Sequence, residues 1–244
     1  MTTIASTHNP KLKALRRLQT KRGRAADGRF LVEGEDLVIA ARAAGRPPVE
    51  GYRLAGVDVA GEDFHEVERS ALGSVSTLGS STRVIAVYEQ RWSTPVGPLC
   101  VYLHGVGDPG NVGTVLRSAA AFGASCVVFG PHCADPHSPK AVRASMGAIF
   151  AVAIARAGGP EGLPGQSIAL DARAQETLQG PIDPDAGAVT LLIGAEREGL
   201  PAEVLAACER SVRIPIATES LNAAMAATVA LYEMTRRTSR VPTS

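Results

Sequence analysis

The sequence predicts an α/β protein with a small N-terminal domain and a larger C-terminal domain built on a mostly parallel sheet. From Leu99 onward, continuous apolar stretches of the kind found in buried strands alternate with helical stretches. This pattern is typical of a parallel sheet covered by helices on both faces. The part before it mixes helical and alternating patterns, and residues 91–98, which carry two prolines and one glycine, separate the two parts. We therefore expect domains at residues 1–94 and 95–244.

The length and composition of the chain are those of an ordinary globular protein. The 244 residues are 45% hydrophobic and 20% charged, with a net charge of +1, which allows a sizeable core and argues against disorder. No uncharged apolar run approaches the roughly 18 to 20 residues of a membrane helix, and the N-terminus lacks the apolar region of a secretion signal. The four cysteines are scattered without zinc-ligand spacing. We expect a cytoplasmic protein with no metal, no membrane contact and no disulfide framework.

Four patterns define the N-terminal domain after its basic beginning. Residues 35–45 have the spacing of an amphipathic helix, and Gly45 is placed to end it. Residues 52–60 and 83–89 have the character of strands, and residues 62–72 between them predict another helix. Together they predict a small α/β unit.

The C-terminal domain alternates strand and helix along its whole length. The predicted strands cover residues 99–106, 125–130, 149–154, 167–172, 190–196 and 212–216. The predicted helices cover residues 111–122, 138–148 and 201–209, with a last one from about Ser220. Because ligands of parallel sheets bind at loops beyond the carboxyl ends of the strands, we expect the functional site in these loops.

Positive charge is concentrated at the N-terminus. Residues 1–30 hold eight basic side chains against the single acid Asp27, whereas the rest of the chain is close to neutral. A solvated helix face would explain such a run, but exposed helices usually carry opposite charges at i and i+4. The near absence of compensating acids favours contact with the phosphates of a nucleic acid. The candidate RNA-binding residues are Lys11, Lys13, Arg16, Arg17, Lys21 and Arg22.

A glycine pattern after the first strand of the C-terminal domain matches a dinucleotide-binding motif only superficially. Residues 105–110 read G-x-G-x-x-G between a predicted strand and a predicted helix. However, Pro109 removes an N–H that a pyrophosphate would use. The next strand also ends in Phe129 and Gly130, where a ribose-binding acid is expected. A nicotinamide-dependent oxidoreductase is therefore disfavoured.

The first of three loop motifs opens the helix at residues 111–122. Asn111 is a good N-cap residue, so capping alone would explain it. Gly113 is unfavourable near a helix start, which points to a close approach of another group to the backbone. Arg117 lies four residues later on the same face, and its guanidinium reaches back toward the anion-friendly helix start. We interpret Arg117 as a phosphate-holding residue rather than a surface ion-pair partner.

The second and third motifs follow later strands. Residues 194–200 leave a buried strand, and Glu196 stands at its end, where a plain loop does not require an acid. Residues 214–216 predict a short strand before Ser220, Leu221 and Asn222, which open the last helix. A capping role for Ser220 or Asn222 is the alternative reading. The apolar spacing of that helix indicates a core or dimer face.

Taken in order, these motifs resemble one family. The series N-x-G-x-x-x-R with S-A-A-A-F-G, then I-G-A-E-R-E-G-L, then I-P-I, S-L-N and A-L-Y-E is similar to the signature of the SpoU (TrmH-like) branch of the SPOUT RNA methyltransferases. The resemblance extends from Leu99 to about Arg237. At the front, S-T-H-N-P-K-L-K-A-L-R-R-L and G-R-F-L-V-E-G-E resemble the ribosomal-protein-like substrate-binding domain of rRNA 2′-O-methyltransferases.

The resemblance implies an S-adenosylmethionine-dependent RNA 2′-O-ribose methyltransferase whose catalytic domain forms a deep trefoil knot. It also implies a homodimer through this domain, with rRNA favoured over tRNA because of the N-terminal domain. The connection at residues 216–219 is two residues shorter than in many members of the family. The residues that the resemblance assigns to the cofactor loops are Leu170, Gly194, Ile214, Ile216 and Leu221.

The resemblance further assigns Arg117 as the suspected catalytic residue. A guanidinium stays protonated, so we expect Arg117 to bind a neighbouring phosphate and to stabilise the developing alkoxide rather than to act as a base. Asn111, Glu196, Ser220 and Asn222 would position Arg117 and the ribose. Two alternatives stay open: a tRNA 2′-O-methyltransferase, and a non-catalytic RNA-binding protein of the same fold.

Overall fold

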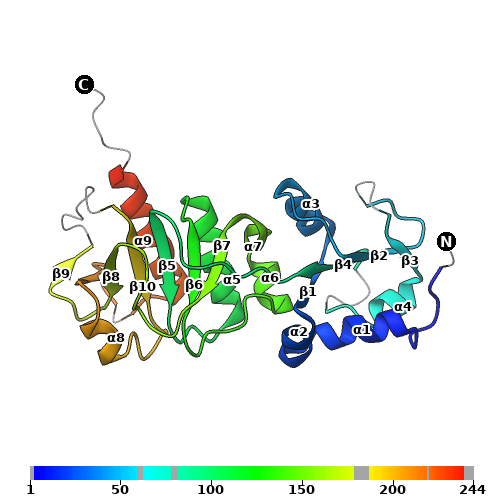
Figure 1. Ribbon diagram of the computed structural model, residues 1–244, viewed down its shortest axis with the longest axis horizontal. Coiled ribbons are helices and arrows are strands. Elements are labelled where there is room, and N and C mark those ends of the chain that lie inside the picture. Colours follow the sequence, from blue (N-terminus) through cyan, green and yellow to red (C-terminus); the bar gives the residue numbers. More distant parts are fainter. Residues whose placement is uncertain (1–2, 60–62, 78–81, 179–186, 219, 239–244) are drawn as a thin grey trace, which may run out of the picture. The chain divides into compact units, whose positions relative to one another are not determined.

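The computed structural model describes residues 3–59, 63–77, 82–178, 187–218 and 220–238. The chain divides into two compact units, and each takes two stretches of the sequence (Figure 1). The first unit consists of Met1–Arg91 and Asp135–Ala151, and the second of Trp92–Ala134 and Val152–Ser244.

The first unit contains a four-stranded mixed sheet. The strands lie in the order β1-β4-β2-β3, with β3 parallel to β2 and the other neighbours antiparallel. Their bounds are β1 Arg29–Glu33, β2 Glu50–Leu54, β3 His65–Val67 and β4 Val84–Glu89. The helices of its first stretch are α1 Pro10–Leu18, α2 Lys21–Asp27, α3 Glu35–Ala43 and α4 Arg69–Gly73.

Helix α1 covers this sheet with one apolar face. Asn9 caps its start by accepting from the Lys11 N–H at 2.9 Å, and Pro10 supplies the first helical residue. Its three leucines are spaced three residues apart, so they share one face, and all are buried with Leu31, Tyr52 and Ile85 of the strands. The basic side chains of α1 are thereby directed away from the core.

The prediction of one helix in the first unit was wrong over more than half of its length. Residues 62–72 were expected to be helical, but His65–Val67 form β3 and only α4 follows. Parallel pairing with β2 provides backbone partners and buries Val67 completely, so tertiary packing overrides the local helical pattern. The prediction that Gly45 ends the preceding helix is confirmed, since α3 stops at Ala43 and Gly45 has a φ of +66°.

Residues 135–151 join the first unit although their neighbours in sequence belong to the second. Helices α6 (Pro139–Ala144) and α7 (Ala148–Ala151) lie in this segment. The ring of Phe30 on β1 lies 4.7 Å from that of His137 and 6.0 Å from that of Phe150. The expected boundary at residues 94–95 assigns this segment to the second domain. That division into functional domains stays a prediction.

A buried ion pair also holds this segment in the first unit. The guanidinium of Arg24 on α2 lies 2.7 Å from the Asp135 carboxylate, and the Arg24 side chain is only 4% exposed. Although burial alone would raise the pKa of Asp135, hydrogen bonds from His137 and Arg24 hold that pKa well below its usual range. The expected strand at residues 149–154 was partly wrong, because Ile149 and Phe150 belong to α7.

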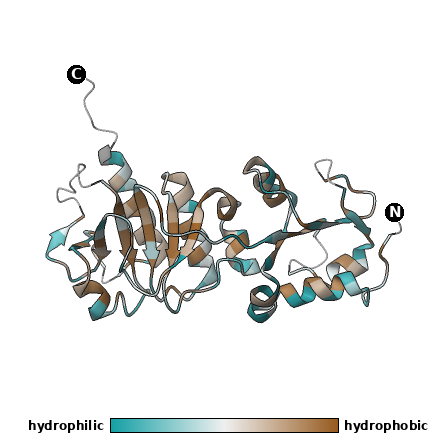
Figure 2. Cartoon of the chain, in the orientation of Figure 1, coloured by the Kyte–Doolittle hydropathy of each residue, from teal (hydrophilic) through white to brown (hydrophobic). Residues whose placement is uncertain are grey.

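The second unit contains a seven-stranded sheet in the order β7-β6-β5-β10-β8-β11-β9, and every neighbouring pair is parallel. The α/β class with a parallel sheet is therefore confirmed. Figure 2 shows the central strands as strongly hydrophobic. Their bounds are β5 Leu99–Leu103, β6 Cys126–Phe129, β7 Ala153–Arg156, β8 Gln166–Leu170, β9 Glu176–Thr177, β10 Val189–Ile193 and β11 Arg210–Arg213.

Three helices in the described residues of the second unit accompany this sheet. Helix α5 (Pro109–Ala121) packs against α9 (Ala223–Thr238), and the hydroxyls of Ser118 and Thr228 lie 2.6 Å apart between them. Helix α8 (Ala202–Ala206) contributes Val204 to a core cluster with the central strands. The trefoil knot implied by the family resemblance stays a prediction.

None of the helices in the described ranges has both the length and the apolar character that crossing a bilayer requires.

Candidate active site

A pocket of about 510 Å³ lies where three neighbouring parallel strands end. Its lining includes Leu170 at the end of β8, Gly194 directly after β10 and Ile214 directly after β11. These strands are adjacent in the sheet, so their carboxyl ends meet at one edge. This edge is the usual ligand site of an open parallel sheet, and the volume is ordinary for a small-molecule site.

The five residues expected to hold a cofactor all line this pocket: Leu170, Gly194, Ile214, Ile216 and Leu221. One expectation about their local structure was wrong, since residues 214–216 form no strand and β11 ends at Arg213. Pro215 has no N–H to donate to a ladder, and this stretch serves as pocket wall instead. Glu219, in the connection at residues 216–219, lies outside the described residues.

The second motif folds into a tight hairpin beside the pocket. Ala195 and Gly199 exchange two backbone hydrogen bonds of 3.1 and 3.0 Å, and Gly199 has a φ of +69°. A Cβ on Gly194 would lie 2.1 Å from the carbonyl carbon of Gly199, so no larger residue fits there. The hairpin thus places Glu196, Arg197 and Glu198 at its tip, and all three line the pocket.

A hydrogen-bonded chain of three side chains links the three motifs. The Asn111 amide donates to the Glu196 carboxylate, and the Asn222 amide donates to the Asn111 carbonyl oxygen at 3.1 Å. The Asn222 carbonyl oxygen accepts from the backbone N–H of Ala224 at 3.0 Å and so caps α9. Asn222 therefore caps a helix and orients Asn111 at the same time.

The alternative reading of Asn111 as merely the cap of its own helix does not hold. Asp108 is the N-cap of α5, and its carboxylate accepts from the Asn111 backbone N–H at 3.0 Å. Pro109 then takes the first helical position, where a missing N–H has no cost. The side chain of Asn111 is thereby available for Glu196 and Asn222.

Arg117 and Ser220 lie outside this chain. Ser220 lines the pocket and is exposed. Arg117 is exposed on α5, and its side chain forms no hydrogen bond or ion pair with any residue in the described ranges. Of the residues expected to act in catalysis, the structure brings together Asn111, Glu196 and Asn222, places Ser220 at the pocket, and leaves Arg117 unpaired.

The candidate RNA-binding residues of the first unit divide into two groups. Lys11 pairs with Glu50, Arg17 pairs with Asp27 at 2.5 Å, and Arg16 donates to the carbonyl oxygen of Thr7 at 2.9 Å. The second group is exposed and makes no side-chain hydrogen bond or ion pair within the part of the chain that the structure describes; it consists of Lys13, Lys21 and Arg22. Only the second group has its full charge available.

Two arginines at the pocket were not among the sequence-based candidates. Arg173 and Arg197 both line it and are exposed. Arg173 follows the carboxyl end of β8 by three residues, and Arg197 stands inside the second motif. Only their position in the sequence could have identified them, because residues that follow a parallel strand lie at the edge of the sheet where ligands bind.

Comparisons with known proteins agree with this architecture. The model of the SpoU rRNA Methylase family matches residues 98–232, and that of the MRM3-like substrate binding domain matches residues 9–86. The chain is 32% identical to an uncharacterized tRNA/rRNA methyltransferase of Synechocystis, covering 96% of this chain and 93% of the relative. It is 28% identical to the 23S rRNA (guanosine(2553)-2′-O)-methyltransferase RlmP of Bacillus subtilis, covering 96% and 99%.

Among solved structures, the AdoMet-bound rRNA methyltransferase of Sinorhizobium meliloti superposes with a TM-score of 0.85 at 33% identity, covering 97% of this chain and 98% of that one. The family match spans more than half of the sequence and includes the three motifs, two of which line the pocket. The chain therefore belongs to the SpoU rRNA methylase family.

Proposed function

We propose that this protein transfers the methyl group of S-adenosylmethionine (AdoMet) to a ribose 2′-hydroxyl of ribosomal RNA. SpoU membership makes it an AdoMet-dependent RNA 2′-O-ribose methyltransferase. The observation that carries the proposal is that the second and third motifs line one pocket, while the Asn111–Glu196–Asn222 hydrogen bonds join the first motif to them. Two features support rRNA as the substrate: the match to a substrate-binding domain at residues 9–86, and the 23S rRNA specificity named for the Bacillus relative.

The pocket residues fit AdoMet. Ile193, Leu200 and Val212 line the pocket and are buried, so they provide an apolar interior for an adenine ring. Acids of the lining, Glu196 and Glu198, complement a positively charged sulfonium. When bound, AdoMet supplies a methyl group that its sulfonium already activates for transfer.

The chain's own residues must orient the ribose hydroxyl and stabilise the negative charge that develops on its oxygen. The Asn111 amide donates to Glu196, and its carbonyl oxygen accepts from the Asn222 amide. The orientation of these three side chains is therefore determined before RNA binds. Arg117 carries a guanidinium that stays protonated at neutral pH. It therefore serves as a cation for an RNA phosphate and for the developing alkoxide, and not as the base.

A homodimer through the second unit is part of the proposal. Met225, Val229 and Tyr232 of α9 are 60%, 41% and 54% exposed and follow an i, i+4, i+7 spacing. This spacing places them in one apolar stripe, which a second copy would cover. A cytoplasmic location follows from rRNA as the substrate.

The test is transfer of labelled methyl from AdoMet to ribosomal RNA and to tRNA, followed by mapping of 2′-O-methylated riboses. We expect label in rRNA, and about a tenfold or greater loss of turnover for Asn111→Ala, since this substitution removes a charge-assisted hydrogen bond. Thr114→Ala is the matched control, because Thr114 is exposed on the same helix and takes no part in the Asn111–Glu196–Asn222 hydrogen bonds. Label confined to tRNA would favour the tRNA alternative, and RNA binding without AdoMet binding would favour the non-catalytic one.

A further inference from the structure

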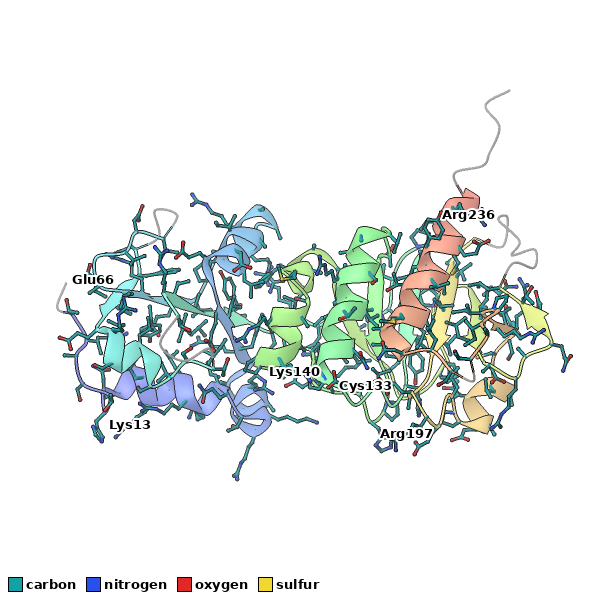
Figure 3. The ribbon with its side chains drawn as sticks, turned by 180° about the vertical axis from the view of Figure 1, so that it is seen from behind. Lys13, Glu66, Cys133, Lys140, Arg197 and Arg236 are labelled. Carbon is teal, nitrogen blue, oxygen red and sulfur yellow. The ribbon has the colours of Figure 1, made fainter. Side chains whose placement is uncertain are left out.

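The lining of the pocket changes from apolar to charged toward solvent. Its buried members include Ile193, Leu200 and Val212, whereas Arg173, Arg197 and Glu198 are exposed. We call these three exposed residues the mouth of the pocket. Figure 3 labels Arg197 among the side chains on the connection between β10 and α8.

Both arginines of the mouth stand on fixed backbone but have free guanidinium groups. The hairpin closed by Ala195 and Gly199 holds Arg197 at its tip, and the Asp171 carboxylate accepts from the Arg173 backbone N–H at 3.1 Å. Within the described ranges, neither guanidinium forms a hydrogen bond or an ion pair. By contrast, Arg210 of the same unit pairs with Glu176. Two placed and unpaired guanidiniums at one opening indicate an anion partner.

The charges around them select the kind of anion. Arg197 has Glu196 and Glu198 as its chain neighbours, and Asp171 precedes Arg173 by two residues; all of them line the pocket. An RNA phosphate at this point would meet carboxylates of its own sign. A zwitterion gains from both signs, because its carboxylate reaches the guanidiniums while its ammonium reaches the acids.

We propose that Arg197 and Arg173 bind the α-carboxylate of the amino-acid end of AdoMet, with Asp171 and Glu198 facing its α-ammonium. This inference rests on the proposed function, since it assumes AdoMet in this pocket. The charged side chains of the mouth then recognise the methionine end of AdoMet. The apolar interior of the pocket binds the adenine ring. The two ends of the cofactor are then selected by separate groups of residues.

The test compares ligands that keep or lack the amino-acid end. Calorimetry would measure the affinity of wild type, Arg197→Gln and Arg173→Gln for AdoMet, S-adenosylhomocysteine and 5′-methylthioadenosine, which lacks the amino acid. We expect each substitution to weaken binding of the first two about tenfold, as loss of a charge-assisted hydrogen bond does. Affinity for 5′-methylthioadenosine should stay within about twofold, because the interaction strength of the adenosine site is unchanged.

Arg213→Gln is the matched control, because Arg213 is exposed on β11 but does not line the pocket. Arg197→Lys should recover part of the lost affinity, since it restores the charge without the bidentate geometry. Equal losses for all three ligands, or wild-type affinity for AdoMet in both arginine variants, would overturn the inference. So would variants that bind rRNA more weakly but AdoMet normally. If wild type binds none of the three ligands, the proposed function itself fails.

Discussion

Some of the basic residues of α1 and α2 have acidic partners within the protein, whereas the two arginines at the pocket have none within the described ranges. In the first unit, Lys11 and Arg17 form ion pairs with acids of the same unit. At the pocket, Arg173 and Arg197 have no such partner within the described ranges, and the same is true of Arg117 on α5. A run of positive charge in a sequence therefore overstates the charge available to a ligand, and an isolated arginine can be the freer group.

Arg24 is the extreme case of a charge used inside the protein. It belongs to the same basic stretch as Lys21 and Arg22, yet its side chain is 4% exposed and paired with Asp135. Its guanidinium also donates to the carbonyl oxygens of Leu18 and Gln19 at 3.0 and 2.8 Å. These hydrogen bonds and the ion pair all point into the protein, so Arg24 holds α2 and residues 135–151 in one unit.

Replacing Arg24 should give the largest effect on stability. Arg24→Met leaves Asp135 buried without its cation, and loss of one partner of a buried pair costs about 3 to 5 kcal/mol. Urea unfolding would measure this loss. The double variant Arg24→Met, Asp135→Leu should recover part of it, because no unpaired charge then stays buried. Unchanged stability with weaker RNA binding would instead place Arg24 among the RNA-contacting cations.

Replacing Arg117 should give the largest effect on turnover without affecting stability. We expect Arg117→Ala to lower methyl transfer about 100-fold, a magnitude typical for loss of one group that stabilises a developing oxyanion. The side chain is exposed and has no partner in the part of the chain that the structure describes, so the melting temperature and the affinity for AdoMet should stay near those of wild type. Near-normal turnover would remove Arg117 from the mechanism.

Acidification offers a smaller and more specific test of the buried pair. The pKa of Asp135 is lowered in the folded protein, because hydrogen bonds from His137 and Arg24 outweigh the effect of burial. Its stabilising contribution is thus complete above the unfolded pKa of about 4 and is lost as pH falls toward the folded pKa. Below about pH 4, unfolding free energy should fall more steeply in wild type than in Asp135→Asn. Parallel curves for the two proteins would show that this carboxylate is not stabilised by folding.

The smallest expected effect is on the salt dependence of RNA binding, and it compares unpaired with ion-paired cations of the first unit. Lys21→Gln with Arg22→Gln should weaken rRNA binding and reduce the slope of log affinity against log salt by about 1.5, because two phosphate contacts disappear. The matched pair Lys11→Gln with Arg17→Gln should change that slope less, since those charges already have acidic partners. Equal changes for both pairs would mean that RNA displaces the internal ion pairs.

Local patterns predicted the main features of both the sheet and the site. The continuous apolar runs indicated buried parallel strands, and the family resemblance directed attention to Leu170, Gly194 and Ile214, which line one pocket. The errors arose where short segments depend on distant partners. His65–Val67 is a strand because β2 lies beside it, and Ile149 and Phe150 are helical within the first unit.

Periodicity and motifs of fixed spacing were enough to predict the fold class, the family and several of the residues that line the pocket. Only the tertiary structure decided which polar groups are already bonded to each other. It gave the cap of α5 to Asp108, released Asn111 for Glu196 and buried Arg24 against Asp135. Among the described residues, it left the guanidiniums of Arg173 and Arg197 without a partner. The physical reason is that hydrogen bonds and ion pairs depend on distances of a few ångströms between residues that, in the pairs of Asn111 and Arg24, lie 85 and 111 positions apart in the chain.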